Sequence, residues 1–529
     1  MMPVMPTQTD SLDSARQRIR AAFDPALLQS AGAELVERLA EHLAAVEACR
    51  KPVLNWCEPR ANADVARTFL LERRVAGAGR SAAEEAPDDG ADRGFASLQP
   101  RPHEVVAKFA ELIDTMLARG HNLHDPRYVG HQVPAPVPIA GLFDALASVT
   151  NQVTAIYEMS PWAAACETAV IEALGERFGL QPGTFAGTIT HGGSLANTTA
   201  LLTARNVVFP ESWERGMDGA KPQAVLVSHA EAHYCIARTA GILGLGTNQV
   251  VKAALDERRR IDPRQLDEQL ARLRSENRPI MAVVACACAT PVGAFDPLND
   301  VADVCQKHDV WLHVDAAHGG AACFSEKYKH LIAGLERADS FICDAHKMMF
   351  MPALCAFVFY RDKAVRFETF RQDAPYLFDP SAPGLADYDG GLKTIECTRR
   401  ATAYATWGVW SLFGPQLFAD LVDVTFDMGR RFYELLSEAD DFEPLHEPEC
   451  NIVVFRHVPR ELREAPPEVV GKFQLDLRRD VIESGEFYLV PTFKDGIPAL
   501  RVTIINPLST VDHLRQLMDT LRVRGRKFV

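Results

Sequence analysis

Short apolar runs alternate with segments of helical periodicity from about residue 185 of this 529-residue chain onward. Five of these runs predict strands, at residues 224–228, 281–288, 310–315, 340–343 and 355–360. Between two of them, Pro297–Lys307 predicts a helix with Asp296 as its N-cap. This alternation predicts an α/β domain with a mostly parallel sheet between helices. Such sheets bind ligands at the C-terminal ends of their strands.

The first 125 residues follow a helical pattern instead. Pro25–Cys49 carries apolar residues at helical spacing, and Pro102–Ala118 begins at a proline, which favours a helix start. An apolar stripe can pack on its own subunit or on a second one, and spacing alone leaves that choice open. Residues 1–15 predict disorder, and residues 74–100 predict a mobile loop or linker.

The pattern changes again at about residue 415. A strand at Asn451–His457, a helix at Pro467–Glu483, strands at 487–493 and 499–505 and a helix at 509–524 predict a small α+β domain. Ser509–Asp512 predicts a capping box before the last helix. The chain is therefore expected to divide into an N-terminal helical segment (1–125), a large α/β domain (126–414) and a small C-terminal domain (415–529).

Composition narrows the classes of function. A net charge of −14 disfavours nucleic acid and anionic membranes as partners. No apolar run reaches about 18 residues and the start has no signal-peptide pattern, so neither a membrane span nor secretion is predicted. The twelve cysteines form no C-x-x-C motif, and Cys286 and Cys288 are expected to be buried thiols. A reducing cytoplasm fits this usage best.

One lysine follows an apolar run directly. Ser340–Cys343 predicts a buried strand, and Lys347 comes after it among Ala, His and Met residues. Apolar surroundings lower the pKa of a lysine and make its amine the nucleophile that a Schiff base needs. The alternative is a lysine that simply extends from a strand end into solvent.

The preceding strand ends on an acid. Asp309–Gly320 is an apolar run that delivers Asp315 and then small residues. A pyridoxal phosphate (PLP) site needs a lysine for the aldehyde and a carboxylate that keeps the ring nitrogen protonated. His191–Thr199 adds a Gly-Gly-Ser turn before a helix, where backbone N–H groups can bind a phosphate. Together these three motifs favour a PLP site.

In this order the motifs resemble those of the PLP-dependent group II amino-acid decarboxylases, which include glutamate, diaminobutyrate and aromatic amino-acid decarboxylases. The resemblance covers about residues 120–510. It implies PLP fold type I, the aspartate-aminotransferase-like fold. It also implies a homodimer with the active site at the interface, in which N-terminal helices pack across the partner.

The resemblance also implies a role for each cofactor-binding residue. Lys347 would carry PLP and Asp315 would pair with the ring nitrogen. His233 would stack on the pyridine ring and relay a proton. The remaining contacts would be Gly193, Ser194 and His346 at the phosphate, Thr290 near the cofactor and Ala317 under the ring. For Thr290 an ordinary turn at a strand end is an equal alternative.

A long loop rich in proline and glycine spans Ala374–Leu392, and loops of this kind are often functional lids. Ala386–Gly391 matches the mobile catalytic loop of the family, and Tyr388 stands where decarboxylases carry the tyrosine that returns a proton to Cα. Some relatives carry phenylalanine there and form aldehydes or other products. Tyr388 therefore favours simple decarboxylation.

Two residues are candidates for substrate binding. Gln132 lies in a Pro-rich segment that resembles the substrate-side loop of the family, although a plain surface loop is an equal alternative. Arg501 lies in an apolar strand, where a buried guanidinium needs a carboxylate partner. The resemblance to glutamate decarboxylases implies a substrate carboxylate, and a structural ion pair is the alternative. Gly130–Pro136 departs from the loop of the glutamate enzymes, so glutamate itself is in doubt.

Metal binding is the main competing interpretation of the histidines. His229 and His233 are four residues apart, but Glu231 is out of phase with the H-E-x-x-H pattern of zinc proteases. His313, Asp315 and His318 form a second cluster, in which the ring acid explains Asp315 without a metal. No metal site is therefore predicted.

The sequence as a whole predicts decarboxylation of an L-amino acid to its amine and CO2. Another PLP reaction on the same fold (aminotransfer, C–C lyase chemistry or oxidative deamination) and a non-catalytic dimeric scaffold are the alternatives. The substrate stays open. Val292–Asp296 and Asp344–Met349 resemble the glutamate-type and diaminobutyrate-type members more than the aromatic ones.

Overall fold

The computed structural model describes residues 15–17, 19–70, 101–217, 223–370 and 386–529. The chain forms two compact units, one comprising Met1–Asp125 with Ile482–Phe487 and the other Pro126–Val481 with Tyr488–Val529. The predictions for residues 1–14, for the loop at 74–100 and for residues 374–385 lie outside the described residues. The domain boundary predicted between residues 414 and 415 stays a prediction.

The N-terminal unit is built from three main helices, α2 (Pro25–Glu47), α3 (Pro59–Leu70) and α4 (Pro102–Arg119). Helix α2 begins after Asp24, whose side chain accepts a hydrogen bond from the N–H of Ala26 at 2.9 Å. Both α2 and α4 begin at prolines, which have no N–H to leave unpaired in the first turn. The helices predicted at Pro25–Cys49 and Pro102–Ala118 are confirmed to within two residues.

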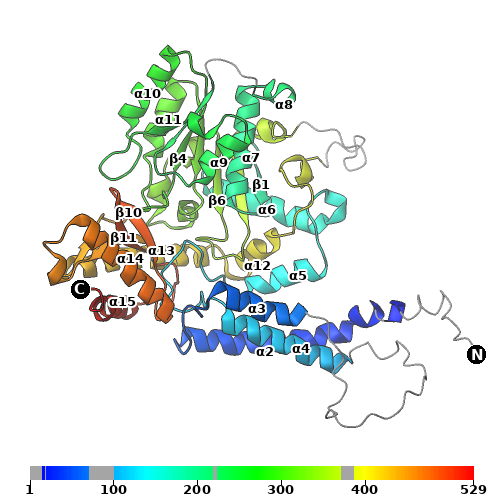
Figure 1. Cartoon of the computed structure of the whole chain (residues 1–529). Helices are drawn as coiled ribbons and strands as arrows, with labels where there is room; N and C mark the ends of the chain where they lie inside the picture. Colours follow the sequence, from blue (N-terminus) through cyan, green and yellow to red (C-terminus); the bar gives the residue numbers. More distant parts are fainter. Residues whose placement is uncertain (1–14, 18, 71–100, 218–222, 371–385) are drawn as a thin grey trace, which may run out of the picture. The chain divides into compact units, whose positions relative to one another are not determined.

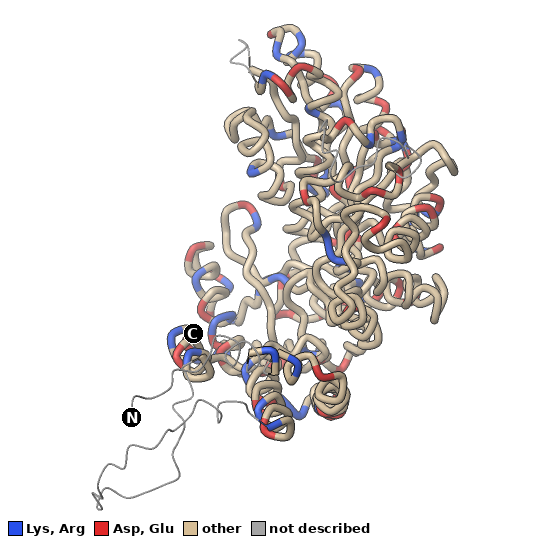
Figure 2. The backbone as a smooth tube through the Cα atoms, turned by 90° about the vertical axis from the view of Figure 1, so that its right-hand side faces the viewer, with Lys and Arg blue, Asp and Glu red and all other residues tan. Residues whose placement is uncertain are grey.

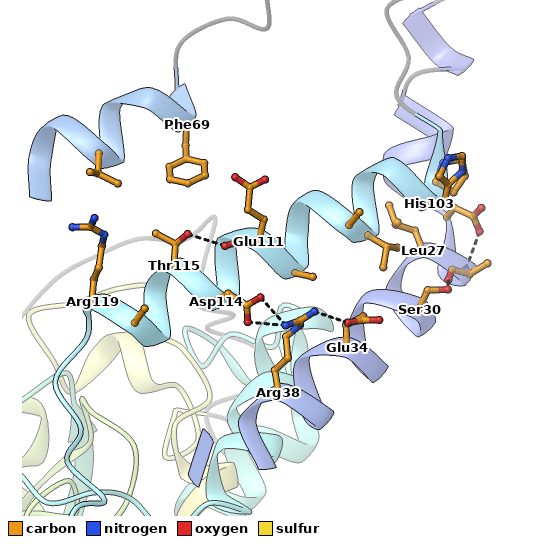
Figure 3. A pocket seen from close by; sticks show the side chains of 18 residues that line it. Leu27, Ser30, Glu34, Arg38, Phe69, His103, Glu111, Asp114, Thr115 and Arg119 are labelled. Atoms are coloured by element: carbon orange, nitrogen blue, oxygen red, sulfur yellow. Dashed lines mark hydrogen bonds and ion pairs between the residues drawn. The ribbon is translucent and has the colours of Figure 1, made fainter. Parts of the chain in front are cut away.

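A cavity of about 1250 Å³ lies among the helices of this unit (Figure 3). On its floor, Nη1 of Arg38 lies 2.7 Å from both carboxylate oxygens of Asp114, and Nη2 lies 3.2 Å from Glu34. This charge group ties α2 to α4. None of the residues predicted to bind the cofactor or the substrate lines this cavity.

The second unit contains a seven-stranded sheet in the order β1-β7-β6-β5-β4-β2-β3. All neighbouring strands are parallel except β7, which is antiparallel to β1 and β6. The mostly parallel sheet is thus confirmed, although β1 and β3 were not predicted. The strands are β1 (Ala186–Thr190), β2 (Val225–His229), β3 (Val250–Ala253), β4 (Ile280–Cys286), β5 (Trp311–Asp315), β6 (Ser340–Asp344) and β7 (Ala356–Tyr360).

Helices cover both faces of this sheet (Figure 1). On one face α7 (Gly193–Val208) packs against β1 and β4 to β7, and α9 (Cys235–Ile242) packs on α7. On the other, α10 (Pro263–Ser275) and α11 (Leu298–Lys307) cover β3 to β5. Right-handed crossover connections place the helices in this way. Through α7 and α9 the chain moves along the sheet from β1 toward β3, and through α10 and α11 it moves back from β3 to β5. Three further helices are α5 (Ala140–Val149), α6 (Pro161–Arg177) and α12 (Ala403–Phe413).

The start of α11 differs from the sequence prediction. The helix begins at Leu298 with Pro297 as its N-cap, so Asp296 is not the cap. The buried Asp296 carboxylate instead accepts hydrogen bonds from the N–H groups of Ile261 (2.6 Å) and Cys286 (2.7 Å). A buried carboxylate needs such donors, and two backbone N–H groups, one of them at the end of β4, supply them here.

The C-terminal part of this unit forms a four-stranded antiparallel sheet in the order β10-β11-β9-β8. The predicted α+β character is confirmed, but β8 was not predicted. The cap of α15 is one residue off, because Thr510, not Ser509, accepts the N–H of His513 at 3.4 Å. The elements are α13 (Gln416–Ser437), β8 (Phe442–Pro444), β9 (Ile452–His457), α14 (Pro467–Ser484), β10 (Val490–Lys494), β11 (Ile497–Thr503) and α15 (Val511–Gly525).

Charged residues of both signs are interspersed along the chain in Figure 2. Among the described residues, no helix is both long and apolar enough to cross a membrane.

Candidate active site

A cavity of about 330 Å³ lies where strands of the large sheet end and α7 begins. It is the place that the alternation of strands and helices predicts for a ligand. Nine of the predicted site residues line it: Gln132, Gly193, Ser194, His233, Thr290, Asp315, Ala317, His346 and Lys347.

Asp315 is the last residue of β5 and is held by two N–H donors. Its Oδ2 accepts from Nδ2 of Asn197 at 3.1 Å, and its Oδ1 accepts from the backbone N–H of Ala317 at 3.1 Å. Asn197 lies in the first turns of α7, so this bond fixes the acid against the helix that begins at the Gly-Gly-Ser turn. Both oxygens being engaged, the carboxylate has one orientation.

His313 supports Asp315 from behind. Burial lowers the pKa of His313 to about 4, so the ring is neutral at pH 7. Its Nε2 lies 2.8 Å from Oδ1 of Asn197 and its Nδ1 lies 2.9 Å from Oγ of Ser340. Both nitrogens are therefore occupied by hydrogen bonds, which leaves none for a metal ion. Across the part of the chain that the structure describes, no group of three or more His, Cys, Asp or Glu side chains could hold one.

Lys347 follows the end of β6, in a turn closed by the bond from its N–H to the carbonyl of Asp344 (3.2 Å). Its Nζ lies 3.4 Å from Oδ2 of Asp344. Burial lowers the pKa of Lys347, but the carboxylates of Asp344 and Asp315 together raise it above its usual value. The lowered pKa expected from apolar neighbours is therefore wrong, because those neighbours in sequence are not the ones that the amine meets in space.

Asp344 is the residue that sequence reasoning missed. It is buried, and besides Lys347 it contacts His346, whose Nε2 lies 3.5 Å from Oδ2. Burial raises the pKa of Asp344, while Lys347 and His346 oppose that effect. It stands three residues before the lysine, where a strand end turns back. This spacing could have predicted the contact with Lys347, because a helical or turn geometry brings residues that are three apart close together.

The Gly-Gly-Ser turn fits closely over Asp344. A Cβ atom on Gly193 would lie 2.6 Å from Oδ2 of Asp344, so no side chain can stand there. Gly192 has a φ of +108°, which only glycine adopts without strain. The turn is thus a backbone cradle at the start of α7, of the kind that binds phosphate groups.

His233 lines the cavity from the segment before α9. Its Nδ1 accepts the N–H of Cys235 at 3.3 Å, and its ring lies 4.1 Å from that of Tyr234. Burial lowers its pKa, which favours the neutral imidazole needed for stacking on an aromatic cofactor. His229 is not its metal partner, because Nδ1 of His229 accepts the N–H of Glu231 and Nε2 lies 3.0 Å from the carbonyl of Arg259.

Tyr388 and Arg501 do not line this cavity. Tyr388 lines another one, of about 410 Å³, beside Lys393, and its ring packs 5.6 Å from that of Tyr157. Arg501 is buried in β11, and within the described residues its Nε and Nη2 have no hydrogen-bond partner. The roles predicted for both residues stay predictions.

The cavity fits PLP on its own geometry. It joins an amine, an acid at the end of the adjacent parallel strand and a glycine cradle in which a Cβ would collide with Asp344. These three features define a PLP site on a fold of type I.

Comparison with known proteins agrees with this class. Residues 100–458 match the model of the pyridoxal-dependent decarboxylase conserved domain. The human acidic amino acid decarboxylase GADL1 is 30% identical over 433 residues, which cover 80% of this chain and 82% of that protein. The crystal structure of mouse CSAD has a TM-score of 0.81 at 26% identity and covers 95% of this chain and 98% of that one.

One more solved structure is similar in fold. Rice (Oryza sativa) TDC, crystallised with PLP and tryptamine, has a TM-score of 0.81 at 21% identity, covering 95% of this chain and 98% of that one. The chain belongs to the pyridoxal-dependent decarboxylase family. It is a PLP-dependent amino-acid decarboxylase with PLP as its cofactor.

The charges around Lys347 lead to a prediction for the enzyme without cofactor. Asp344→Asn should lower the pKa of Lys347, because it removes the nearest carboxylate that stabilises the ammonium form. A larger share of the amine is then neutral at a given pH. The rate of reaction with pyridoxal, followed by stopped-flow absorbance from pH 6 to 10, should therefore reach half its maximum at a lower pH than in the wild type.

Pyridoxal is used because it has no phosphate that could respond to the lost charge directly. Asp512→Asn, which removes an exposed carboxylate on α15, is the control and should leave the pH profile unchanged. A profile that Asp344→Asn also leaves unchanged would show that this carboxylate does not set the charge of Lys347.

Proposed function

We propose that this enzyme converts a non-aromatic L-amino acid to its amine and CO2, with acidic amino acids as the first candidates. One observation carries the proposal: Lys347 and Asp315 stand at the ends of adjacent parallel strands and line one cavity with the glycine cradle. The acidic substrate class is supported by the human relative, which is named an acidic amino acid decarboxylase.

Each residue then has a task. Lys347 holds the cofactor covalently, and Asp315 keeps the ring nitrogen protonated. Gly193, Ser194 and His346 hold the phosphate. His233 covers one face of the ring, with Thr290 and Ala317 completing the wall. When bound, the cofactor supplies an electron sink for the pair of electrons that CO2 leaves behind.

Arg501 is proposed to bind a carboxylate of the substrate. A buried guanidinium with two N–H positions open needs an anion, and within the described residues neither Nε nor Nη2 has a partner. The charge of Arg501 acts on Cys288 and His318, which line the cavity. Gln132 lines it as well and is proposed to contribute its amide.

A homodimer with the active site at the interface is part of the proposal. Leu142, Leu146 and Val149 on α5 and Leu412 and Phe413 on α12 are each more than half exposed, and these two helices contact each other. Such an apolar surface favours association. Tyr388 would then reach the cavity of a second copy of the chain, where it returns a proton to Cα. The twelve cysteines are free thiols, which supports a reducing cytoplasm.

The alternatives differ in their products. Aminotransfer gives a keto acid, and decarboxylation-coupled oxidative deamination gives CO2, ammonia and an aldehyde. A C–C lyase gives fragments of the side chain, and a scaffold gives no product. A tyrosine at position 388 favours protonation at Cα and so the amine. The net charge of −14 disfavours nucleic acid as a partner.

Product analysis is expected to give amine and CO2 in equal amounts. Enzyme loaded with PLP is incubated with aspartate, glutamate, 2,4-diaminobutyrate, lysine and tryptophan, and amine, CO2, ammonia and aldehyde are measured. An acidic substrate should react fastest. Lys347→Ala should abolish both products, and Arg501→Met should raise KM by about ten- to hundredfold, because it removes a charged hydrogen-bond partner.

The possible results are distinct. Ammonia or aldehyde in place of amine would contradict decarboxylation as the outcome. Amine from tryptophan alone would leave the reaction standing but refute the substrate class. An unchanged KM in Arg501→Met would refute the role of this arginine.

Mixing two inactive chains tests whether Tyr388 acts on the second copy. In a hybrid of a Lys347→Ala chain and a Tyr388→Phe chain, one site combines an intact lysine with an intact tyrosine if the two come from different chains. Random pairing should then restore about a quarter of wild-type amine formation. Refolding the two variants together and measuring amine provides the test.

Amine is measured because the Tyr388→Phe chain can still release CO2 while forming another product. Each variant refolded alone is the control. No gain of amine over those controls would place Tyr388 and Lys347 of a working site on the same chain.

A further inference from the structure

His191 stands directly before the Gly192–Ser194 turn and lines the same cavity as Lys347. Its ring Nδ1 lies 2.5 Å from Oε1 of Glu396, and its backbone N–H donates to Oε2 of the same residue at 3.4 Å. One carboxylate thus holds both the ring and the backbone. Since a carboxylate only accepts, Nδ1 carries the proton.

The other ring nitrogen is left open. Nε2 of His191 is buried, and among the described residues it has no hydrogen-bond partner. A buried polar atom without a partner calls for a ligand or a water molecule. Its place beside the glycine cradle at the start of α7 makes an anionic oxygen the fitting ligand.

A second histidine of the cavity shows why the carboxylate matters. His318 also has one unpartnered buried nitrogen, Nδ1, but its Nε2 faces Oδ1 of Asn451 at 2.9 Å and so carries the proton. Burial lowers the pKa of His318 to about 3, with Lys347 and Arg501 adding to the effect. Its free nitrogen is therefore a lone pair, which repels anions. A ring between Glu396 and a second anion can instead donate from both nitrogens.

The neighbouring Asp344 creates the need for such a donor. Its carboxylate lies directly under Gly193, so a phosphate on the cradle meets a buried negative group. Like charges at short range are costly where water is excluded. His346 offsets part of this through its contact with Asp344, and a second imidazole on the cradle would offset more.

We propose that His191 binds the phosphate of the cofactor through Nε2, and that Glu396 is the positioning residue that orients its ring. The inference rests on the proposed placement of the phosphate at Gly193 and Ser194. Glu396 follows Tyr388 on the same segment, which Arg399 anchors to Glu167 at 3.1 Å. The pair therefore joins the phosphate end of the cavity to the segment that carries Tyr388.

Comparing PLP with pyridoxal isolates the phosphate. Both bind Lys347 through the aldehyde, so the ratio of the Kd for pyridoxal to the Kd for PLP reports the phosphate contacts alone. Apoenzyme is titrated with each compound and binding is followed by quenching of protein fluorescence. His191→Ala should reduce this ratio by about ten- to hundredfold, the range of one charge-assisted hydrogen bond.

Two further variants separate binding from structure. His191→Gln places an amide N–H near the position of Nε2 and should keep most of the ratio. Glu396→Gln should lower it by less than His191→Ala does, since it leaves the imidazole in place. His308→Ala is the matched control: Nε2 of His308 pairs with Asp267 at 2.7 Å, and His308 does not line this cavity. It should leave the ratio at the wild-type value.

A wild-type ratio in His191→Ala would overturn the proposal. A raised substrate KM with a wild-type ratio would also overturn it and assign the open nitrogen to a substrate carboxylate. If His191→Ala does not fold, the Kd ratio is measured in Glu396→Gln instead. A wild-type ratio in that variant overturns the proposal. Because these titrations contain no substrate, an error in the proposed substrate class leaves their result unaffected.

Discussion

A cation between two buried carboxylates is the interaction on which the active site depends. Lys347 stands within reach of Asp344 at the end of its own strand and is influenced by Asp315 from the next one. Parallel pairing of β5 and β6 sets this arrangement, because Asp315 pairs with Ile342 and so places the acid at the edge where the lysine turn begins. Lys347 therefore balances the charge of Asp344 directly and that of Asp315 only through the electrostatic field, since Asn197 and the N–H of Ala317 hold the oxygens of Asp315.

The same interaction corrects one step of the reasoning from sequence. The apolar neighbours of Lys347 in the sequence predict a lowered pKa, but its pKa is raised. Burial does lower the pKa of another lysine, Lys393, near Tyr388. A lowered pKa alone would thus have selected Lys393. The prediction for Lys347 rests on the order of motifs along the chain and not on the local polarity.

The sheet was predictable because its strands are apolar runs flanked by amphipathic helices, as in α11, where Leu298, Val301, Ala302 and Cys305 face the core. The strand Ala186–Thr190 was missed because Gly and Thr dilute its apolar signal. Eight of the nine site residues fall into one cavity because they end or follow strands of the sheet, and Gln132 comes from the segment between α4 and α5. The partners of Asp315 and Asp344 could not be read in advance, since Asn197 and Gly193 meet them only through the folding of α7 onto the sheet. The predicted caps Asp296 and Ser509 each lie one residue before the observed caps, Pro297 and Thr510. Capping patterns do not fix a helix start to a single residue.

The direct measurement is to fix the cofactor in place and find the residue that carries it. Holoenzyme reduced with borohydride, digested and analysed by mass spectrometry should show the phosphopyridoxyl group on the peptide that contains Lys347. Asp315→Ala should weaken retention of the cofactor without moving the label, because the ring nitrogen loses its partner. Label on Lys393, or on any lysine other than Lys347, would contradict the account.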